Sequence, residues 1–329
     1  MNSSNRKKLG IFALAFVLLF VVFISGLHIL ESTVFNNETA LEPEQEVTDS
    51  KTVEKDNIKY FPRQDITTLL LIGVDQMGKA EDSGFHVNEG SADVVALLVF
   101  DEKNEEINIL SFNRDSMVEI PLLGMTGERA GTFVGQLALS HTYGSGLEDS
   151  CENTLETISN LLGGLEIDYY AALNMGGIPA VNDAVGGVTV NVTDDFSAVD
   201  PDITIGEFTL KGEQALTFIR SRKNLGDQLN ISRGERHKEY VKGFVESYHS
   251  RTESESVFAT KILDATEGYL VTNCSANVLM GFAERYGDYE IGEIVSPKGE
   301  NILGEEFYEF YIDEGNLEEI KLKFFYAPK

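Results

Sequence analysis

Charged side chains stand at the ends of three apolar, β-branched segments, a placement that suits a ligand site. Asp75 follows the segment 66–74, Asp93 precedes the segment 94–100, and Arg114 and Asp115 follow the segment 107–112. In open α/β sheets, strand ends line the crevice in which ligands bind. Two carboxylates with one open side also suit Mg²⁺, which keeps several waters and bridges to the phosphates of a ligand. Asp75 and Asp93 are therefore candidate metal ligands, although charged residues at strand ends in an acidic chain are often only polar boundaries.

A basic window interrupts an otherwise acidic chain. Residues 220–242 hold seven cations against three acids, a charge of +4, whereas all 329 residues together carry a formal charge of −28. The cations are Arg220, Arg222, Lys223, Arg233, Arg236, Lys238 and Lys242. Such a window is either a solvated charged face or a site for an anion.

Two features of this window favour the anion site. Residues 232–235 form a capping box, which predicts that Ser232 is the N-cap of a helix. Arg233 and Arg236 then fall in the first turn of that helix, where the helix dipole disfavours cations unless an anion is bound beside them. The two arginines of residues 220–222 end a preceding predicted helix and could close over the same anion with their guanidinium groups.

The elements that must position these residues are predicted from hydrophobic patterns. The three apolar segments are expected to be strands buried on both faces, and the link at 101–106 is too short for a helix, so the second and third strands should form an antiparallel hairpin. Further strands are predicted at 168–173, 187–192 and 320–326, and helices at 135–143, 147–162, 178–184, 211–222 and 233–248. This mixture predicts an α/β fold class, with one mixed central β-sheet and helices on both faces.

The N-terminal segment predicts the compartment. Residues 9–30 contain no Asp, Glu, Lys or Arg, and about 20 apolar residues are enough for a transmembrane helix. Basic residues precede this stretch, so residues 1–8 should be cytoplasmic. Residues 31–60 are then expected to be an acidic linker, and 61–329 an extracytoplasmic domain. The alternative is a cleaved signal peptide, whose apolar core is usually about 7–15 residues long.

Composition and missing motifs exclude several function classes. A strongly acidic chain repels phosphate backbones, which argues against nucleic-acid binding. The chain has no GxxxxGK[ST], HExxH or GxSxG segment, so the P-loop, zincin and serine-hydrolase classes lack their residues. Cys151 and Cys274 are too few for a disulfide framework, although an extracytoplasmic location would allow them to pair.

Eight short segments, in order along the chain, carry a resemblance to a known family. They are LLLIGVD (69–75), SADVVALLVF (91–100), LSFNRDSMVEI (110–120), QLALSHTYG (136–144), NLLGGLEIDYYAALNM (160–175), NDAVGGVTVNV (182–192), LKGEQALTFIRSR (210–222) and GDQLNISRGERHKEY (226–240). With these segments after one predicted anchor, residues 64–329 resemble the LytR–CpsA–Psr family of membrane-anchored cell-envelope proteins.

The resemblance implies a function and a site. It implies a Mg²⁺-dependent phosphotransferase of the bacterial cell membrane that moves a glycopolymer, such as teichoic acid or capsule, from a polyprenyl pyrophosphate carrier to peptidoglycan, with the lipid held in a hydrophobic tunnel. It assigns Asp75 and Asp93 to the metal, Asp93, Arg114 and Asp115 to catalysis, and Arg220, Arg222, Arg233, Arg236 and His237 to the pyrophosphate. Either Asp93 or Asp115 could act as the base.

Departures from the family pattern leave a second function open. The family arginine before the Ser-Asp pair of the second strand is missing from Ser91-Ala92-Asp93. Gln136 occupies the position of a family lysine, and His237 that of a family glutamine. Fewer cations imply weaker pyrophosphate binding, a different donor, or a member that binds without turnover. The alternative function is therefore a non-catalytic sensor of lipid-linked pyrophosphate in the envelope.

Overall fold

The computed structural model describes most of the chain after residue 51. The described residues are 52–55, 57–124, 126–221, 230–250, 252, 255–286, 289–304 and 307–328. The predicted anchor at 9–30 and most of the predicted linker lie outside them. None of the helices in these ranges is long and apolar enough to cross a membrane.

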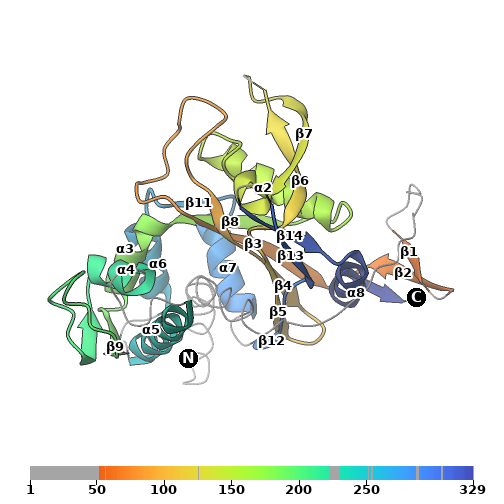
Figure 1. The fold of residues 1–329 in the computed structure, drawn as a ribbon. Coiled ribbons are helices and arrows are strands. Elements are labelled where there is room, and N and C mark those ends of the chain that lie inside the picture. Colours follow the sequence, from red (N-terminus) through yellow and green to blue (C-terminus); the bar gives the residue numbers. More distant parts are fainter. Residues whose placement is uncertain are drawn as a thin grey trace.

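A six-stranded mixed sheet forms the centre of the domain (Figure 1). In spatial order its strands are β11 (Leu270–Thr272), β8 (Tyr169–Asn174), β3 (Ile66–Val74), β4 (Ala92–Asp101), β5 (Glu106–Phe112) and β12 (Glu290–Val295). The β3–β8 and β5–β12 pairs are parallel, and the other three pairs are antiparallel. The predicted strands at 66–74, 94–100, 107–112 and 168–173 and the β4–β5 hairpin are confirmed.

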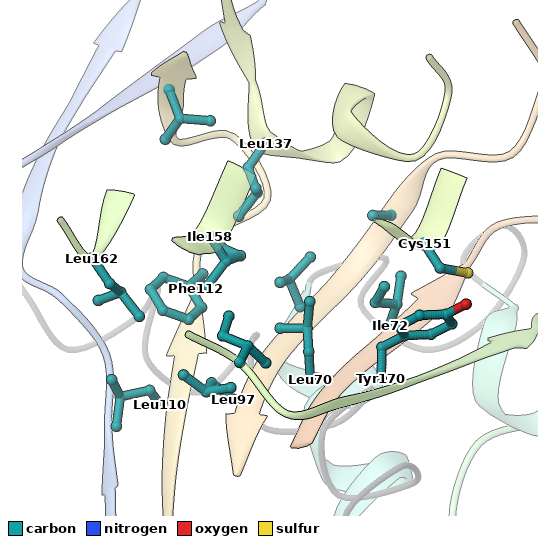
Figure 2. Packing of buried hydrophobic residues seen from close by; sticks show 14 of the residues in the cluster. Leu70, Ile72, Leu97, Leu110, Phe112, Leu137, Cys151, Ile158, Leu162 and Tyr170 are labelled. Atoms are coloured by element: carbon teal, nitrogen blue, oxygen red, sulfur yellow. The ribbon is translucent and has the colours of Figure 1, made fainter. Parts of the chain in front are cut away.

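Alternate side chains of the central strands enter two different cores. Leu70 and Ile72 of β3 pack with Ile158 of α2 (Glu148–Leu161) on one face, as Figure 2 shows. Leu69 and Leu71 pack on the other face with side chains of α7 (Ala276–Tyr286). Because successive side chains of a strand point to opposite faces, a continuous apolar run is required where both faces are covered. The predicted α/β class with helices on both faces is confirmed.

The first of these faces is completed by segments near both ends of the domain. The hairpin of β6 (Met117–Leu123) and β7 (Arg129–Gln136) lies over α2, and α8 (Glu314–Phe325) covers the β5 side. Strands β1 (Val53–Lys55), β2 (Ile58–Pro62) and β15 (Tyr326–Pro328) form a small sheet, in which Tyr326 pairs with Pro62. The folded domain therefore includes residues that were assigned to the linker.

A third core lies beyond the β8 side of the sheet and is mainly helical. Its elements are α3 (Ile178–Ala184), β9 (Val188–Val192), β10 (Gly206–Leu210), α4 (Glu213–Arg220), α5 (Asn230–Ser250) and α6 (Glu255–Ala265). Helix α5 crosses β9 so closely that a Cβ on Gly243 would lie 2.0 Å from the carbonyl oxygen of Thr189. A larger residue at this position would push α5 away from β9. The α5 side chains that contact α4 would then move as well.

Three predictions of local structure are wrong. Of the predicted strand 320–326, residues 320–325 are the end of α8, because Leu317, Ile320 and Phe324 repeat at helical spacing on a buried side, and only Tyr326 lies in a strand, β15. The segment 135–143 is the end of β7 and a 3₁₀ turn, Leu137–Ser140, not a longer helix. Helix α5 begins at Asn230, so Ser232 lies inside it and is not its N-cap. The possibility left open for Cys151 and Cys274 is also settled: they are buried in the cores on opposite faces of the sheet and are not paired.

Candidate active site

The sheet register brings the predicted strand-end residues to one edge. Strand β3 ends where its antiparallel neighbour β4 begins, since Val74 pairs with Ala92, and β5 ends at the same edge, since Phe112 pairs with Val95. Asp75, Asp93, Arg114 and Asp115 therefore share this edge, as the strand ends predict. The backbone N–H of Asp75 also donates to the carbonyl of Ser91, at 3.0 Å, which holds the two strand ends together.

Three ion pairs form at this edge. Nη1 of Arg114 lies 2.7 Å from Oδ1 of Asp93, and its Nε lies 3.6 Å from Oδ1 of Asp115. Nη2 of Arg220, at the end of α4, donates to Oδ1 of Asp75 at 3.0 Å. The five side chains are between 23% and 48% exposed, so solvent and ligands can reach them. We call these five residues, Asp75, Asp93, Arg114, Asp115 and Arg220, the edge cluster.

Arg220 is positioned by a contact between α4 and α5. The last carbonyls of a helix lack partners within the helix, and cations are favourable there. Arg236 of α5 donates from Nε to the carbonyl of Phe218, at 3.1 Å, and from Nη2 to that of Ser221. His237 donates from Nε2 to the carbonyl of Ile219, at 2.8 Å, because a carbonyl oxygen can only accept. These bonds fix the end of α4 that carries Arg220.

The Arg236 side chain points into the protein. It is 4% exposed, its Nη1 pairs with Oδ2 of Asp194, and its guanidinium lies over the ring of Phe196, 5.8 Å from the centroid. We call Arg236, His237 and Asp194 the α4–α5 clamp. The predicted contact of Arg236 and His237 with a pyrophosphate stays a prediction. Arg222 and the side chain of Arg233 lie outside the described residues.

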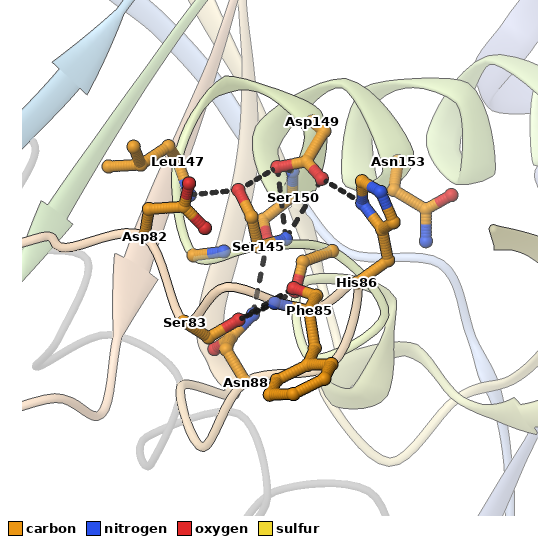
Figure 3. Close-up of polar contacts among 12 residues, drawn as sticks. Asp82, Ser83, Phe85, His86, Asn88, Ser145, Leu147, Asp149, Ser150 and Asn153 are labelled. Carbon is orange, nitrogen blue, oxygen red and sulfur yellow. Dashed lines mark hydrogen bonds and ion pairs between the residues drawn. The ribbon is translucent and has the colours of Figure 1, made fainter. Parts of the chain in front are cut away.

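The loop between Asp75 and Asp93 is braced against the start of α2 (Figure 3). The side-chain amide of Asn88 donates to the carbonyls of His141 and Gly144, at 2.8 and 3.0 Å, and its Oδ1 accepts from the N–H of Gly90 at 2.6 Å. His86 contacts Asp149 at 2.8 Å. The loop that sets the spacing of the two candidate metal ligands is therefore rigidly supported.

His141 supports the same loop from the protein interior. Its Nδ1 lies 3.0 Å from the carbonyl of Gly90, so this nitrogen carries the donated proton. Burial lowers the pKa of His141 to about 4, despite the bond to Gly90, so the ring is neutral. His141 is therefore a structural residue of this loop. Asn88 was missed by sequence reasoning, because nothing near it in the chain indicates four partners more than fifty residues away.

The donor set of the edge cluster fits a hydrated Mg²⁺. Arg220 and Arg114 contact Oδ1 of Asp75 and Asp93, and among the described residues Oδ2 of each carboxylate has no hydrogen-bond partner. The same ranges hold no group of three or more His, Cys, Asp or Glu that could hold a metal ion. Two carboxylate oxygens with water and phosphate completing the shell are the usual way in which proteins hold Mg²⁺.

Comparison with known proteins identifies relatives over most of the chain. The sequence model described as the LytR_cpsA_psr family matches residues 29–324. The polyisoprenyl-teichoic acid–peptidoglycan teichoic acid transferase TagU of Enterococcus faecalis is 27% identical over 243 residues, which are 74% of this chain and 72% of that protein. The TagU protein of Oceanobacillus iheyensis is 30% identical over 57% of this chain, and the match spans about half of its length, 53%.

Solved structures share the fold. The crystal structure of Bacillus subtilis TagV is 24% identical, with a TM-score of 0.56, and the match covers 80% of this chain and 96% of TagV. The structure of TagT bound to LI-WTA is 22% identical, with a TM-score of 0.53, and the match covers 79% of this chain and 90% of TagT. The arrangement of sheet and helices described above is thus the arrangement of these proteins.

Proposed function

We propose that this chain, which belongs to the LytR–CpsA–Psr family, is a phosphotransferase that moves a glycopolymer from a polyprenyl pyrophosphate carrier to peptidoglycan. The relatives named above as teichoic acid transferases support this function. The observation that carries it is the edge cluster, where guanidinium groups from the turn after β5 and from the end of α4, more than one hundred residues apart, lie beside two carboxylates. One oxygen of each carboxylate has no hydrogen-bond partner in the part of the chain that the structure describes. The segment 9–30 would anchor the domain to the cell membrane.

The geometry suggests a division of labour among the cluster residues. Arg114 pairs with Asp93 and Asp115, and Arg220 pairs with Asp75. Both arginines are nearly half exposed, so each guanidinium can turn from its carboxylates to an incoming diphosphate. Asp75 and Asp93 would hold Mg²⁺, which when bound supplies positive charge to the diphosphate. The released guanidinium groups then neutralise the charge that develops on the leaving phosphate.

The acceptor hydroxyl needs a base, and we assign this role to Asp115. Asp93 would already be engaged by the metal, whereas Oδ1 of Asp115 accepts from Nε2 of Gln136 at 3.1 Å, which orients the carboxylate. The hydroxyl oxygen forms a bond to the phosphorus that bears the glycopolymer, and the bond from that phosphorus to the bridging oxygen breaks. Polyprenyl phosphate leaves, and the hydroxyl proton passes to Asp115.

A transfer assay with the full-length protein in lipid nanodiscs tests this function. With Mg²⁺, a synthetic polyprenyl-pyrophosphate glycan and peptidoglycan, we expect release of polyprenyl phosphate and attachment of the glycan. Asp93→Asn should lower the rate by roughly 100-fold or more, the usual effect of losing one polar group that stabilises a transition state. The matched control is Arg285→Ala, which removes an exposed ion pair with Glu102. Because Glu102 follows the opposite end of β4, this variant should keep the wild-type rate.

The same assay separates the enzyme from a sensor. A sensor function is favoured by one observation, since the Arg236 guanidinium is engaged inside the fold and leaves fewer cations for a diphosphate. Binding of the lipid pyrophosphate by the wild type without any transfer, with and without Mg²⁺, would establish the sensor and refute the transferase.

A further inference from the structure

A C-terminal hairpin exposes large apolar side chains beside the edge cluster. Strands β13 (Gly299–Leu303) and β14 (Tyr308–Ile312) form this hairpin. Its exposed side chains are Ile302 (48%), Leu303 (68%), Phe307 (46%), Tyr308 (60%) and Tyr311 (45%). So dense a group of exposed apolar side chains is typical of an interaction surface.

Hydrogen bonds fasten this hairpin to the site. The N–H of Phe310 donates to the carbonyl of Asp115 at 2.9 Å. The side-chain amide of Gln136 donates both to Oδ1 of Asp115, at 3.1 Å, and to the carbonyl of Tyr308, at 2.9 Å. One amide group therefore touches both the candidate base and the hairpin. The apolar surface is a rigid continuation of the edge cluster.

The strand register shows which side chains form a single surface. Tyr308 and Phe310 are two residues apart and share a face, and Leu303 is the direct partner of Tyr308. Phe310 is buried at 8%, whereas Leu303 and Tyr308 continue the same face out into solvent. We call Leu303 and Tyr308 the hairpin ledge. The hairpin ledge thus presents the ring of Tyr308 and the aliphatic side chain of Leu303 to a ligand bound next to Asp115.

The charge of the hairpin restricts what can bind there. Residues 299–312 contain four glutamates and no lysine or arginine. A polyanionic donor such as teichoic acid would be repelled from it, as would an anionic membrane surface. A neutral glycan meets no such repulsion, because its apolar ring faces can pack on Tyr308 and its hydroxyls can donate to carboxylates.

We infer that the hairpin ledge binds the glycan of the peptidoglycan acceptor and presents a sugar hydroxyl to Asp115. This inference rests on the proposed transferase function and names where its acceptor binds. The donor would then approach from the Arg220 side of the edge cluster and the acceptor from the Gln136 side. The two substrates meet between Asp93 and Asp115, which is the arrangement that an in-line displacement needs.

Acceptor binding can be measured without turnover. The probe is a neutral N-acetylglucosamine tetrasaccharide, titrated into the full-length protein in nanodiscs and followed by calorimetry. Tyr308→Ala should weaken its binding roughly tenfold, the equivalent of about 1.4 kcal/mol. The main-chain carbonyl that Gln136 contacts is retained in this variant, so the hairpin should stay in place. The control is Ile291→Ser on β12, an apolar residue exposed to 50%, which should leave binding unchanged.

Transfer kinetics complete the test. Tyr308→Ala should raise the KM for peptidoglycan roughly tenfold and leave the KM for the lipid-linked donor unchanged. Equal tetrasaccharide affinity in wild type and Tyr308→Ala, or a change confined to the donor KM, would overturn the inference while the transferase function stands. If the wild type binds the tetrasaccharide through Tyr308 but transfers nothing, the inference of glycan binding holds and the transferase function fails.

Discussion

The edge cluster and the α4–α5 clamp each contain an arginine–aspartate pair, but the two pairs differ in exposure. Arg220 and Arg236 both pair with an aspartate that is far away in the sequence. In the Arg220–Asp75 pair the side chains are 48% and 35% exposed, whereas in the Arg236–Asp194 pair they are 4% and 13% exposed. An exposed pair is worth little to stability and can be exchanged for a ligand. A buried pair cannot be opened without leaving an uncompensated charge.

This difference assigns the two arginines to different tasks. The clamp satisfies the last carbonyls of α4 and so keeps Arg220 at the sheet edge, where Arg220 can bind. Arg236 is thus a positioning residue, and Arg220 is the group that meets the ligand. The largest effect on stability should therefore come from the clamp, and effects on binding from the edge cluster.

Removal of the clamp arginine should have the largest effect on folding. Arg236→Met leaves Asp194 without this ion pair and removes the donors that Arg236 gives to the carbonyls of Phe218 and Ser221. We expect the free energy of unfolding to fall by about 3–5 kcal/mol, the usual cost of breaking a buried ion pair from one side. Urea denaturation of the full-length protein, followed by circular dichroism, measures this loss.

The matched control for this prediction is an exposed pair. Arg285→Met breaks the contact with Glu102, in which the arginine is 61% exposed, and should cost less than about 1 kcal/mol. If Arg236→Met lowers the free energy of unfolding by no more than Arg285→Met does, the clamp does not stabilise the fold. Arg236 would then be free to bind the ligand, as the sequence predicts.

The edge cluster could be predicted from the sequence because it depends on strand ends. The apolar runs of β3, β4 and β5 are long and unambiguous, so Asp75, Asp93 and the Arg114–Asp115 pair had to gather wherever these strands end. The direction of Arg236 could not be predicted, because it depends on how α5 packs on α4 and on Asp194, 42 residues earlier. Similarly, the aromatic end of α8 was mistaken for a strand because its helical spacing is evident only over a longer stretch.

The buried His141, which supports the loop between Asp75 and Asp93, should make the free energy of unfolding depend on pH. Burial lowers the pKa of His141 to about 4, from its ordinary value of 6.5, so between these pH values the unfolded chain binds a proton that the folded protein does not. Stability must then fall as the pH falls from 6.5 to 4. With about 1.4 kcal/mol for each pKa unit, the loss from this group approaches about 3 kcal/mol at pH 4.

Comparison with a variant isolates this contribution from that of other titrating groups. His141→Gln removes the titrating ring and keeps a donor for the carbonyl of Gly90. We expect the drop in unfolding free energy between pH 7 and pH 4 to be smaller in the variant than in the wild type. An equal drop in both proteins would mean that His141 is not buried as a neutral ring. The loop between Asp75 and Asp93 would then be more open to solvent than the buried Arg236–Asp194 pair.

The smallest effect on stability should come from a substitution of Arg220. This substitution also separates the two regions most sharply, because it should weaken ligand binding. Arg220→Ala removes an exposed pair with Asp75, so the free energy of unfolding should change by less than about 1 kcal/mol. Binding of a diphosphate should weaken by about 1.5–3 kcal/mol, the usual value of a hydrogen bond to a charged group. The probe is farnesyl pyrophosphate with Mg²⁺, titrated into the full-length protein in nanodiscs and followed by calorimetry.

The control must remove a cation of the same basic window that lies elsewhere on the surface. Lys242 of α5 is exposed, so Lys242→Ala makes the same change in net charge and should leave the affinity for farnesyl pyrophosphate within about twofold of the wild type. If both variants weaken binding equally, the effect is a general one of charge, because long-range attraction depends on net charge and not on a directed guanidinium. If only Arg220→Ala weakens it, exposure at the sheet edge is what distinguishes a binding arginine from the structural arginine sixteen residues further along the chain.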